Sequence, residues 1–245
     1  PETLDALRHA LVEVACSHLK VALPEDETGF LNNIHNTVDF SQLNDFRLAV
    51  YNGMNTHSWF RPTYFALSRS CLECLVGNEL AMQNRVNLSI QIPEDDSSLI
   101  NIHADSFSGE SPFQVVQWLP LVDVYDTKSM FILRPELNQA IYPKLKRLAE
   151  ENGVDAWYEE VKDKVTWITV PYGKVVIFNS NLLHGNIVNR TGETRWSFNT
   201  RFKGLFTPYS SNEKNIGKFY LPITTRPVSR IGMDYHHPEG WLGNE

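Results

Sequence analysis

The chain has 245 residues, of which 42% are hydrophobic and 21% charged, a composition typical of a globular protein with a sizeable core. The formal net charge is −7 and the pI is near 5.6, which argues against general nucleic-acid binding because that role needs concentrated positive charge. Three cysteines indicate a reducing, cytoplasmic setting rather than a disulfide scaffold. No apolar run approaches the roughly 20 residues that span a bilayer, so we expect no membrane partner. A small molecule is the expected partner, and the oligomeric state stays open.

The first third of the chain, residues 1–84, has the pattern of amphipathic helices. Leu4, Leu7 and Leu11 recur close to the helical period, and further apolar stripes run through 39–54 and 63–76. We expect this segment to pack on the remainder of a single domain.

From residue 85 the pattern changes to short apolar segments separated by turn residues, which predicts a mainly β core over 85–206. Eight such segments after a helical lead-in favour a double-stranded β-helix, or jelly roll, of the cupin-like type. A long insertion over 135–164 has a helical pattern, and the proline-rich residues 207–245 predict a tail or lid over the core. The eight expected strands are 85–92, 99–104, 113–122, 129–133, 165–170, 174–178, 183–188 and 195–205.

Metal-ligating residue types occur on two of these expected strands. His103 and Asp105 alternate along one strand, so their side chains share a face, and His184 lies on a late strand. Two histidines and one carboxylate, with further coordination positions open, form the ligand set of non-haem Fe(II) oxygenases. Gly185 directly follows His184, and a glycine there either allows another group to approach closely or relieves a tight bend.

Arginines on the last expected strand add a site for anions. Arg195 and Ser197 alternate, so both face the same interior as the metal ligands, and a guanidinium with a hydroxyl is a good receptor for a carboxylate. Arg201 lies an even number of residues further on and also points inward if no bulge intervenes. Because a buried arginine without an anion is costly, two inward arginines predict anionic ligands.

These motifs, HAD at 103–105, LLHG at 182–185 and RWS at 195–197, resemble the Fe(II)/2-oxoglutarate-dependent dioxygenase superfamily and its HxD…H…R order. The resemblance covers about residues 85–205. Residues 85–124 look most like a bacterial branch from carbohydrate and aminoglycoside biosynthesis clusters, similar to the phytanoyl-CoA hydroxylase-like enzymes.

The resemblance implies that His103, Asp105 and His184 bind Fe(II), that Arg195 and Ser197 hold the distal carboxylate of 2-oxoglutarate, and that O2 is consumed. It also implies a further polar contact to 2-oxoglutarate, for which Asn87, Gln91 and Gln117 are candidates. Related halogenases lack the carboxylate that Asp105 supplies, so its presence favours hydroxylation. We expect the substrate to be a small polar molecule such as a sugar or sugar-linked compound.

Substrate contacts are expected from Arg201 and from Trp157 and Tyr158 in the insertion. Tyr235, His236, His237 and Trp241 of the tail are candidates for a cover.

Two alternatives remain open at this point. One is a cupin-type metalloenzyme such as a sugar epimerase or isomerase, although such sites usually draw on more histidines. The other is a non-catalytic carbohydrate-binding jelly roll that keeps the metal as a scaffold. Binding of 2-oxoglutarate would distinguish the oxygenase from both.

Overall fold

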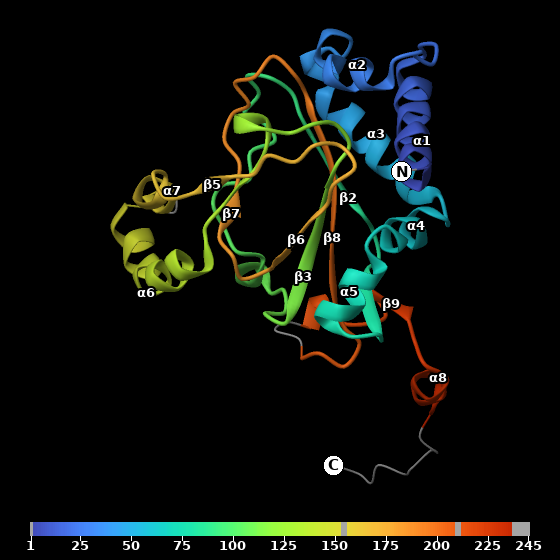
Figure 1. The fold of residues 1–245 in the computed structure, drawn as a ribbon, viewed down its shortest axis with the longest axis vertical. Coiled ribbons are helices and arrows are strands. Elements are labelled where there is room, and N and C mark those ends of the chain that lie inside the picture. The colour runs from blue at the N-terminus through green and yellow to red at the C-terminus, as the bar shows by residue number, and fades with distance from the viewer. Residues whose placement is uncertain (1, 153–155, 209–211, 237–245) are drawn as a thin grey trace.

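The structure, a computed structural model, describes residues 2–152, 156–208 and 212–236. A six-stranded antiparallel sheet lies at its centre. Helices α1 to α5 cover one face of this sheet, and a small three-stranded sheet with helices α6 and α7 lies on the other side (Figure 1). The molecule is therefore layered, and the space between the two sheets is where the chemically interesting residues meet.

The N-terminal helices form because apolar residues recur on one face of each. In α1 the buried stripe contains Leu4, Leu7 and Leu11, as the sequence predicts. The expected helix over 63–76 is instead two short helices. None of the described helices is long and apolar enough to cross a membrane. The α-helices are α1 (Glu2–Leu19), α2 (Glu27–Asn32), α3 (Leu43–Thr56), α4 (Phe60–Ala66), α5 (Arg69–Val76), α6 (Pro135–Asn152), α7 (Ala156–Val161) and α8 (Pro227–Asp234), and the 3-10 turns are η1 (Ile34–Asn36), η2 (Phe40–Gln42), η3 (Asp105–Ser108), η4 (Asp126–Lys128) and η5 (Asn212–Lys214).

The long strand β8 organises the larger sheet. Along one edge it pairs with β3, and along the other it pairs with β2 near its start and with β1 near its end, all antiparallel. Strand β6 extends the sheet beyond β3, and β9 extends it beyond β1. The large sheet contains β1 (Leu80–Gln83), β2 (Asn87–Gln91), β3 (Gln114–Pro120), β6 (Val176–Asn179), β8 (Arg195–Gly204) and β9 (Tyr220–Thr224), and the small sheet contains β4 (Phe131–Ile132), β5 (Thr166–Trp167) and β7 (His184–Gly185).

Aromatic side chains join the large sheet to the helices. Trp196, Phe198 and Phe202 alternate along β8, and all three are fully buried in the main core. Phe46 meets the Trp196 ring edge-on with a centroid separation of 5.9 Å, and Phe60 meets Phe198 at 4.9 Å. Such pairs add to the free energy that comes from removing large apolar surfaces from water.

Several expectations from the sequence need correction here. The label mainly β is too narrow, because helices contain more residues than strands in the described chain. Residues 99–104 form no regular strand; only His103 pairs there, as a single bridge with His184. Strand β1 lies inside the segment predicted as helical, and β9 lies inside the predicted tail. The described part of that tail therefore adds an edge strand, and α8 projects beyond it, away from the small sheet (Figure 1).

The buried ring of Phe198 should be essential to the packing of helices on the sheet. We expect Phe198→Ala to lower the free energy of unfolding by about 3–5 kcal/mol, because it leaves a cavity between β8 and the helices. Urea denaturation followed by far-UV circular dichroism measures this. Phe206→Ala is the control, since Phe206 is 75% exposed and its loss should change stability by no more than about 0.5 kcal/mol. Equal effects of the two substitutions would contradict this account of the core.

Candidate active site

A cavity of about 310 Å³ opens between the two sheets. Side chains of β2, β3 and β8 form one wall, and His103, His184 and their neighbours form the other. Its apolar lining includes Val116, Trp118, Met130 and Phe178. The cavity thus combines a water-excluding surface with a few polar groups, which is the usual make-up of a small-molecule site.

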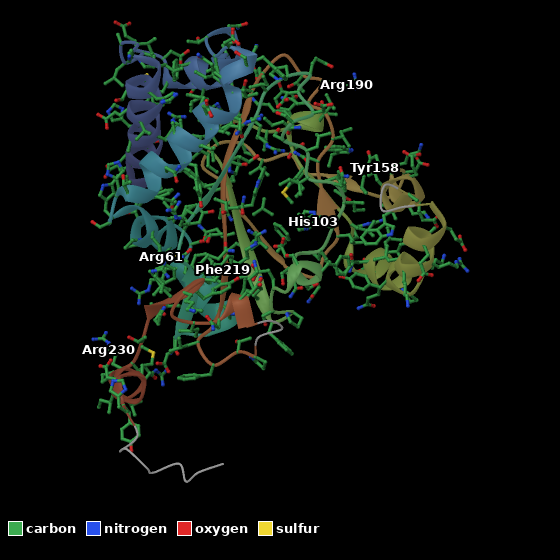
Figure 2. All side chains as sticks on the ribbon, turned by 180° about the vertical axis from the view of Figure 1, so that it is seen from behind. Arg61, His103, Tyr158, Arg190, Phe219 and Arg230 are labelled. Atoms are coloured by element: carbon green, nitrogen blue, oxygen red, sulfur yellow. The ribbon has the colours of Figure 1, made fainter. Side chains whose placement is uncertain are left out.

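His103, Asp105 and His184 come together at this cavity, as the sequence predicts. One ligand atom from each of the three lies within 4.8 Å of the others. Asp105 Oδ1 is 3.5 Å from His103 Nε2 and 3.9 Å from His184 Nε2. Figure 2 places His103 in the interior, on the side of the large sheet opposite the N-terminal helices. This donor set of two imidazoles and one carboxylate fits a divalent metal with open coordination positions.

Backbone contacts fix both histidines with Nε2 toward the carboxylate. The two residues exchange backbone hydrogen bonds of 2.9 Å each, N–H to carbonyl in both directions. The Nδ1 atom of His103 lies 2.8 Å from the Asn101 carbonyl oxygen, and that of His184 lies 2.8 Å from the Leu182 carbonyl oxygen. Because Nδ1–H donates to these acceptors, Nε2 keeps its lone pair for a metal.

The electrostatics of the triad also favour metal binding. Burial lowers the pKa of His184 from 6.5 to about 4, with a further contribution from His103, so this imidazole is neutral at pH 7. Burial alone would raise the pKa of Asp105, but the paired hydrogen bonds and the positive charge of Arg201 oppose this effect, and that pKa lies well below its usual range. A neutral imidazole and an ionised carboxylate are the protonation states that ligate metals.

Gly185 lets the loop before His103 approach strand β7. A Cβ atom at Gly185 would lie 2.9 Å from the Ile100 carbonyl oxygen and 2.9 Å from Phe131 Cζ. Neither the backbone nor the buried ring can move far, so the absence of a side chain is required here. The close approach that the sequence suggested for this glycine is confirmed.

Arg195 forms a buried cationic pocket at the same cavity. The residue is 3% exposed; Nη1 donates to the Ser129 carbonyl oxygen (2.9 Å) and Nη2 to Ser89 Oγ (3.0 Å). Its Nε atom has no hydrogen-bond partner, and among the described residues no carboxylate pairs with the guanidinium. Burial lowers the pKa of Arg195 to about 10, so it is still charged at pH 7. An uncompensated buried cation that faces a cavity is a receptor for an anion.

The other four residues predicted around Arg195 differ in where their side chains lie. Ser197 Oγ is buried without a partner, next to Arg195 on the same face of β8, although it does not line the cavity. Gln91 lies directly opposite Arg195 in the ladder; its Nε2 donates to the Ile187 carbonyl oxygen and its Oε1 has no partner. Asn87 does line the cavity, and its Nδ2 donates to Asn199 Oδ1 (3.2 Å).

Gln117 points the other way. It pairs with Thr200 in the ladder, which belongs to the helix-facing side of β8. Its amide bonds the Tyr64 carbonyl oxygen and Ser68 Oγ in the helical layer. Gln117 therefore points away from this cavity and cannot contact a cofactor bound in it. Successive side chains of a strand point to opposite faces of the sheet, so its neighbours Val116 and Trp118 line the cavity instead.

Arg201 lines the cavity, but its guanidinium is occupied by Asp105. Nε donates to Oδ2 at 2.9 Å and Nη2 donates to Oδ1 at 2.8 Å. Arg201 therefore points into the cavity, as predicted. Its partner, however, is Asp105, one of the three candidate metal ligands. The geometry leaves little of its charge for a substrate.

Trp157 and Tyr158 do not reach this cavity. Trp157 Nε1 donates to the Leu145 carbonyl oxygen, so it packs α7 against α6. The Tyr158 ring packs at a tilt against Phe131 with a centroid separation of 5.1 Å, and Figure 2 shows it farther out than His103. Tyr235 and His236 are exposed beyond α8, and His237 and Trp241 lie outside the described residues.

Some lining residues were not predicted. Ser89, Asn186 and Asn199 are polar and lie at the cavity. The even spacing of Asn199 from Arg195 is a signal that could have identified it. Arg47 could not be identified from strand alternation, because it reaches the cavity from helix α3. Its Nη2 also donates to Asp95 Oδ2 at 2.6 Å.

The packing at Gly185 predicts that a single methyl group there disturbs the site. We expect Gly185→Ala to lower the free energy of unfolding by about 1–3 kcal/mol and to weaken binding of a divalent metal, because His184 must shift with its neighbour. Thermal unfolding and Co(II) titration measure the two effects. Gly192→Ala is the matched control, since a Cβ there has no atom within 4 Å. Identical behaviour of both variants would rule out the proposed close approach.

The depressed pKa of His184 predicts a pH dependence of the metal-free protein. An unfolded histidine takes up its proton near pH 6.5 and the folded one only near pH 4, so this contribution to stability is complete above pH 6.5 and is lost between the two values. The slope should reach at most ~1.4 kcal/mol per pH unit. Chemical denaturation in a chelator, from pH 7 to pH 4, should give a shallower curve for His184→Gln than for the original chain. Parallel curves would show that His184 is not buried in its neutral form.

Comparison with known proteins supports the fold more than the chemistry. No protein-family model matches the sequence, and no curated protein has significant sequence similarity to it. Among solved structures, the chain resembles the nickel complex of the non-heme monooxygenase ThoJ (TM-score 0.55, 15% identity, 90% of this chain and 76% of ThoJ). The apo form of ThoJ gives a TM-score of 0.56 at 13% identity, over 91% of this chain and 77% of ThoJ.

A third structure, HygX from Streptomyces hygroscopicus with nickel and 2-oxoglutarate bound, gives a TM-score of 0.47 at 15% identity, over 59% of this chain and 66% of HygX. ThoJ is described as a non-heme monooxygenase. At such low identity the likeness to ThoJ establishes a shared fold.

Proposed function

We propose that the protein is an Fe(II)- and 2-oxoglutarate-dependent oxygenase whose two sheets form a double-stranded β-helix. The observation that carries the proposal is the combination of two features in one cavity. One is the His103, Asp105 and His184 triad, and the other is the buried guanidinium of Arg195, which has no carboxylate partner within the described part of the chain. A metal alone would explain the first feature but not the second.

The triad would hold the iron. Both imidazoles present Nε2 and the carboxylate presents Oδ1 to one point at the cavity wall, so a metal bound there would keep coordination positions open toward the cavity. Arg195 would hold the distal carboxylate of 2-oxoglutarate, with hydroxyl donors from Ser89 and Ser197 beside it. The unpartnered Arg195 Nε would gain a hydrogen bond when the anion binds.

When bound, iron and 2-oxoglutarate supply the oxidation of a substrate C–H bond by O2, coupled to conversion of 2-oxoglutarate to succinate and CO2. The protein's own part is to bind, orient and exclude water. Val116, Trp118 and Phe178 provide an apolar surface beside the metal ligands, which protects the reacting groups from solvent. Because Asp105 completes the triad, we propose hydroxylation as the outcome.

We propose that the substrate is a small polar molecule, with a sugar or sugar-linked compound as the first candidate. Asn87, Asn199 and Asn186 line the cavity with amide groups. Asn186 Nδ2 and Ser98 Oγ are buried there without hydrogen-bond partners. Carboxamides and hydroxyls can donate to and accept from the hydroxyl groups of such a substrate. The three free cysteines fit action in the cytoplasm.

Neither alternative explains the pocket at Arg195. A cupin-type epimerase or a non-catalytic carbohydrate-binding jelly roll requires no buried cation beside the metal, and a neutral sugar cannot offset its charge. An organic dianion that also chelates the metal can.

Anaerobic titration of the Fe(II)-loaded protein with 2-oxoglutarate tests the proposal. We expect the weak visible charge-transfer band of the chelate, and we expect Arg195→Met to raise the dissociation constant of 2-oxoglutarate at least about 30-fold, equivalent to about 2 kcal/mol or more. Arg195→Lys should retain part of the affinity, because it keeps the charge without the fork.

Two controls make the result decisive. Arg190→Met removes an exposed arginine and should leave 2-oxoglutarate binding unchanged, whereas His184→Ala should abolish the band. Iron binding by the original chain with no band on addition of 2-oxoglutarate would rule out the oxygenase and favour the cupin-type enzyme.

A further inference from the structure

Asp105 differs from the two histidines in how it is held. Both histidines are fixed by their paired backbones, whereas Asp105 begins a 3-10 turn, η3, outside any strand. Its carboxylate is 2% exposed and would otherwise rotate about its side-chain bonds. A carboxylate on a turn needs a separate contact to fix which oxygen faces the metal.

Arg201 supplies that contact from the opposite wall. Its Nε donates to Oδ2 at 2.9 Å and its Nη2 donates to Oδ1 at 2.8 Å, the paired geometry that only a guanidinium can give. The result is that Oδ1 is the oxygen near both imidazoles, at 3.5 Å from His103 Nε2 and 3.9 Å from His184 Nε2.

The arginine is itself held in place. Its Nη1 donates to Asn199 Oδ1 at 3.2 Å, and Asn199 also accepts from Asn87 at 3.2 Å. The Arg201 backbone N–H donates to Gln83 Oε1 at 3.2 Å. Each guanidinium nitrogen therefore has an acceptor, in contrast to Arg195 on the same face of β8, whose Nε has none.

We propose that Arg201 is a positioning residue for the metal centre: its guanidinium fork fixes Asp105 so that Oδ1 alone faces the two imidazoles. The inference rests on the metal site of the proposed function and adds a role for a residue that the sequence assigned to the substrate. With Oδ2 held by Nε, the carboxylate binds through one oxygen and leaves more of the coordination sphere for exchangeable ligands.

Titration with Co(II) alone, without 2-oxoglutarate or substrate, tests this role. We expect Arg201→Met to weaken Co(II) binding by about 10–100-fold and to change the ligand-field absorption of the bound ion, because the freed carboxylate can rotate or bind through both oxygens. Arg201→Lys keeps the charge but not the fork, so its Co(II) affinity should also fall, by a smaller factor. Calorimetry and absorption spectroscopy give the two readouts.

A purely structural role would lower the melting temperature while leaving the Co(II) affinity and spectrum of the folded protein unchanged. All titrations are therefore run well below the melting temperature, with folding checked by circular dichroism. If Arg201→Met does not fold, Arg201→Lys decides the question. Arg190→Met is again the matched control and should behave like the original chain.

The outcomes separate this inference from the proposed function. Failure of the original chain to bind Co(II), or unchanged binding by His184→Ala, would remove the metal site and both proposals with it. Normal binding by the original chain with unchanged affinity and spectrum in both Arg201 variants would overturn only the positioning role. Tighter binding by Arg201→Met would also overturn it, since Arg201 would then compete with the metal for Asp105.

Discussion

The two-sided character of strand β8 is the constraint on which both the core and the site depend. Trp196, Phe198 and Phe202 enter the helical core, while Arg195 and Arg201 point into the cavity from the alternate positions. Because alternation in a strand is strict, a slip of one residue would bury both arginines among the helices and expose the aromatic rings to the metal ligands. The free energy of burying the aromatic face thus also fixes where the two cations lie.

The two arginines on that face differ in their electrostatic compensation. Arg201 is paired with Asp105 inside the protein, whereas the partners of Arg195 among the described residues are one carbonyl and one hydroxyl. In a medium of low dielectric constant an unpaired cation is unfavourable, so the folded chain stores a free-energy cost at Arg195 that the proposed anionic ligand would relieve. Arg201 therefore belongs to the protein's own charge balance, and Arg195 carries the charge available to the proposed ligand.

The sequence predicts those parts of the site that depend on residues near one another in the chain. It does not predict those that depend on how distant segments pair or pack. The grouping of His103, Asp105 and His184 was predictable because residue type, local spacing and order along the chain suffice. The prediction that Gln117 contacts the cofactor was wrong. Which side chains of β3 face the cavity depends on how β3 pairs with β8, and one sequence does not reveal that pairing. Strand β1 was not predicted because it has four residues, too few for an alternating apolar pattern to be distinguished from the helices beside it. Arg47 reaches the cavity from a helix whose docking no local signal encodes.

The regular secondary structure around the metal ligands is short, yet the ligands are well ordered. Strand β7 has two residues and His103 pairs through a single bridge, but the histidines bond each other's backbones and each directs Nδ1 to the carbonyl two residues before it. Both rings thus obtain the same tautomer from local backbone alone, so little conformational freedom is left to lose when a metal binds. Only the carboxylate relies on a distant side chain, which makes the Arg201 contact the part of the site most sensitive to changes in the large sheet.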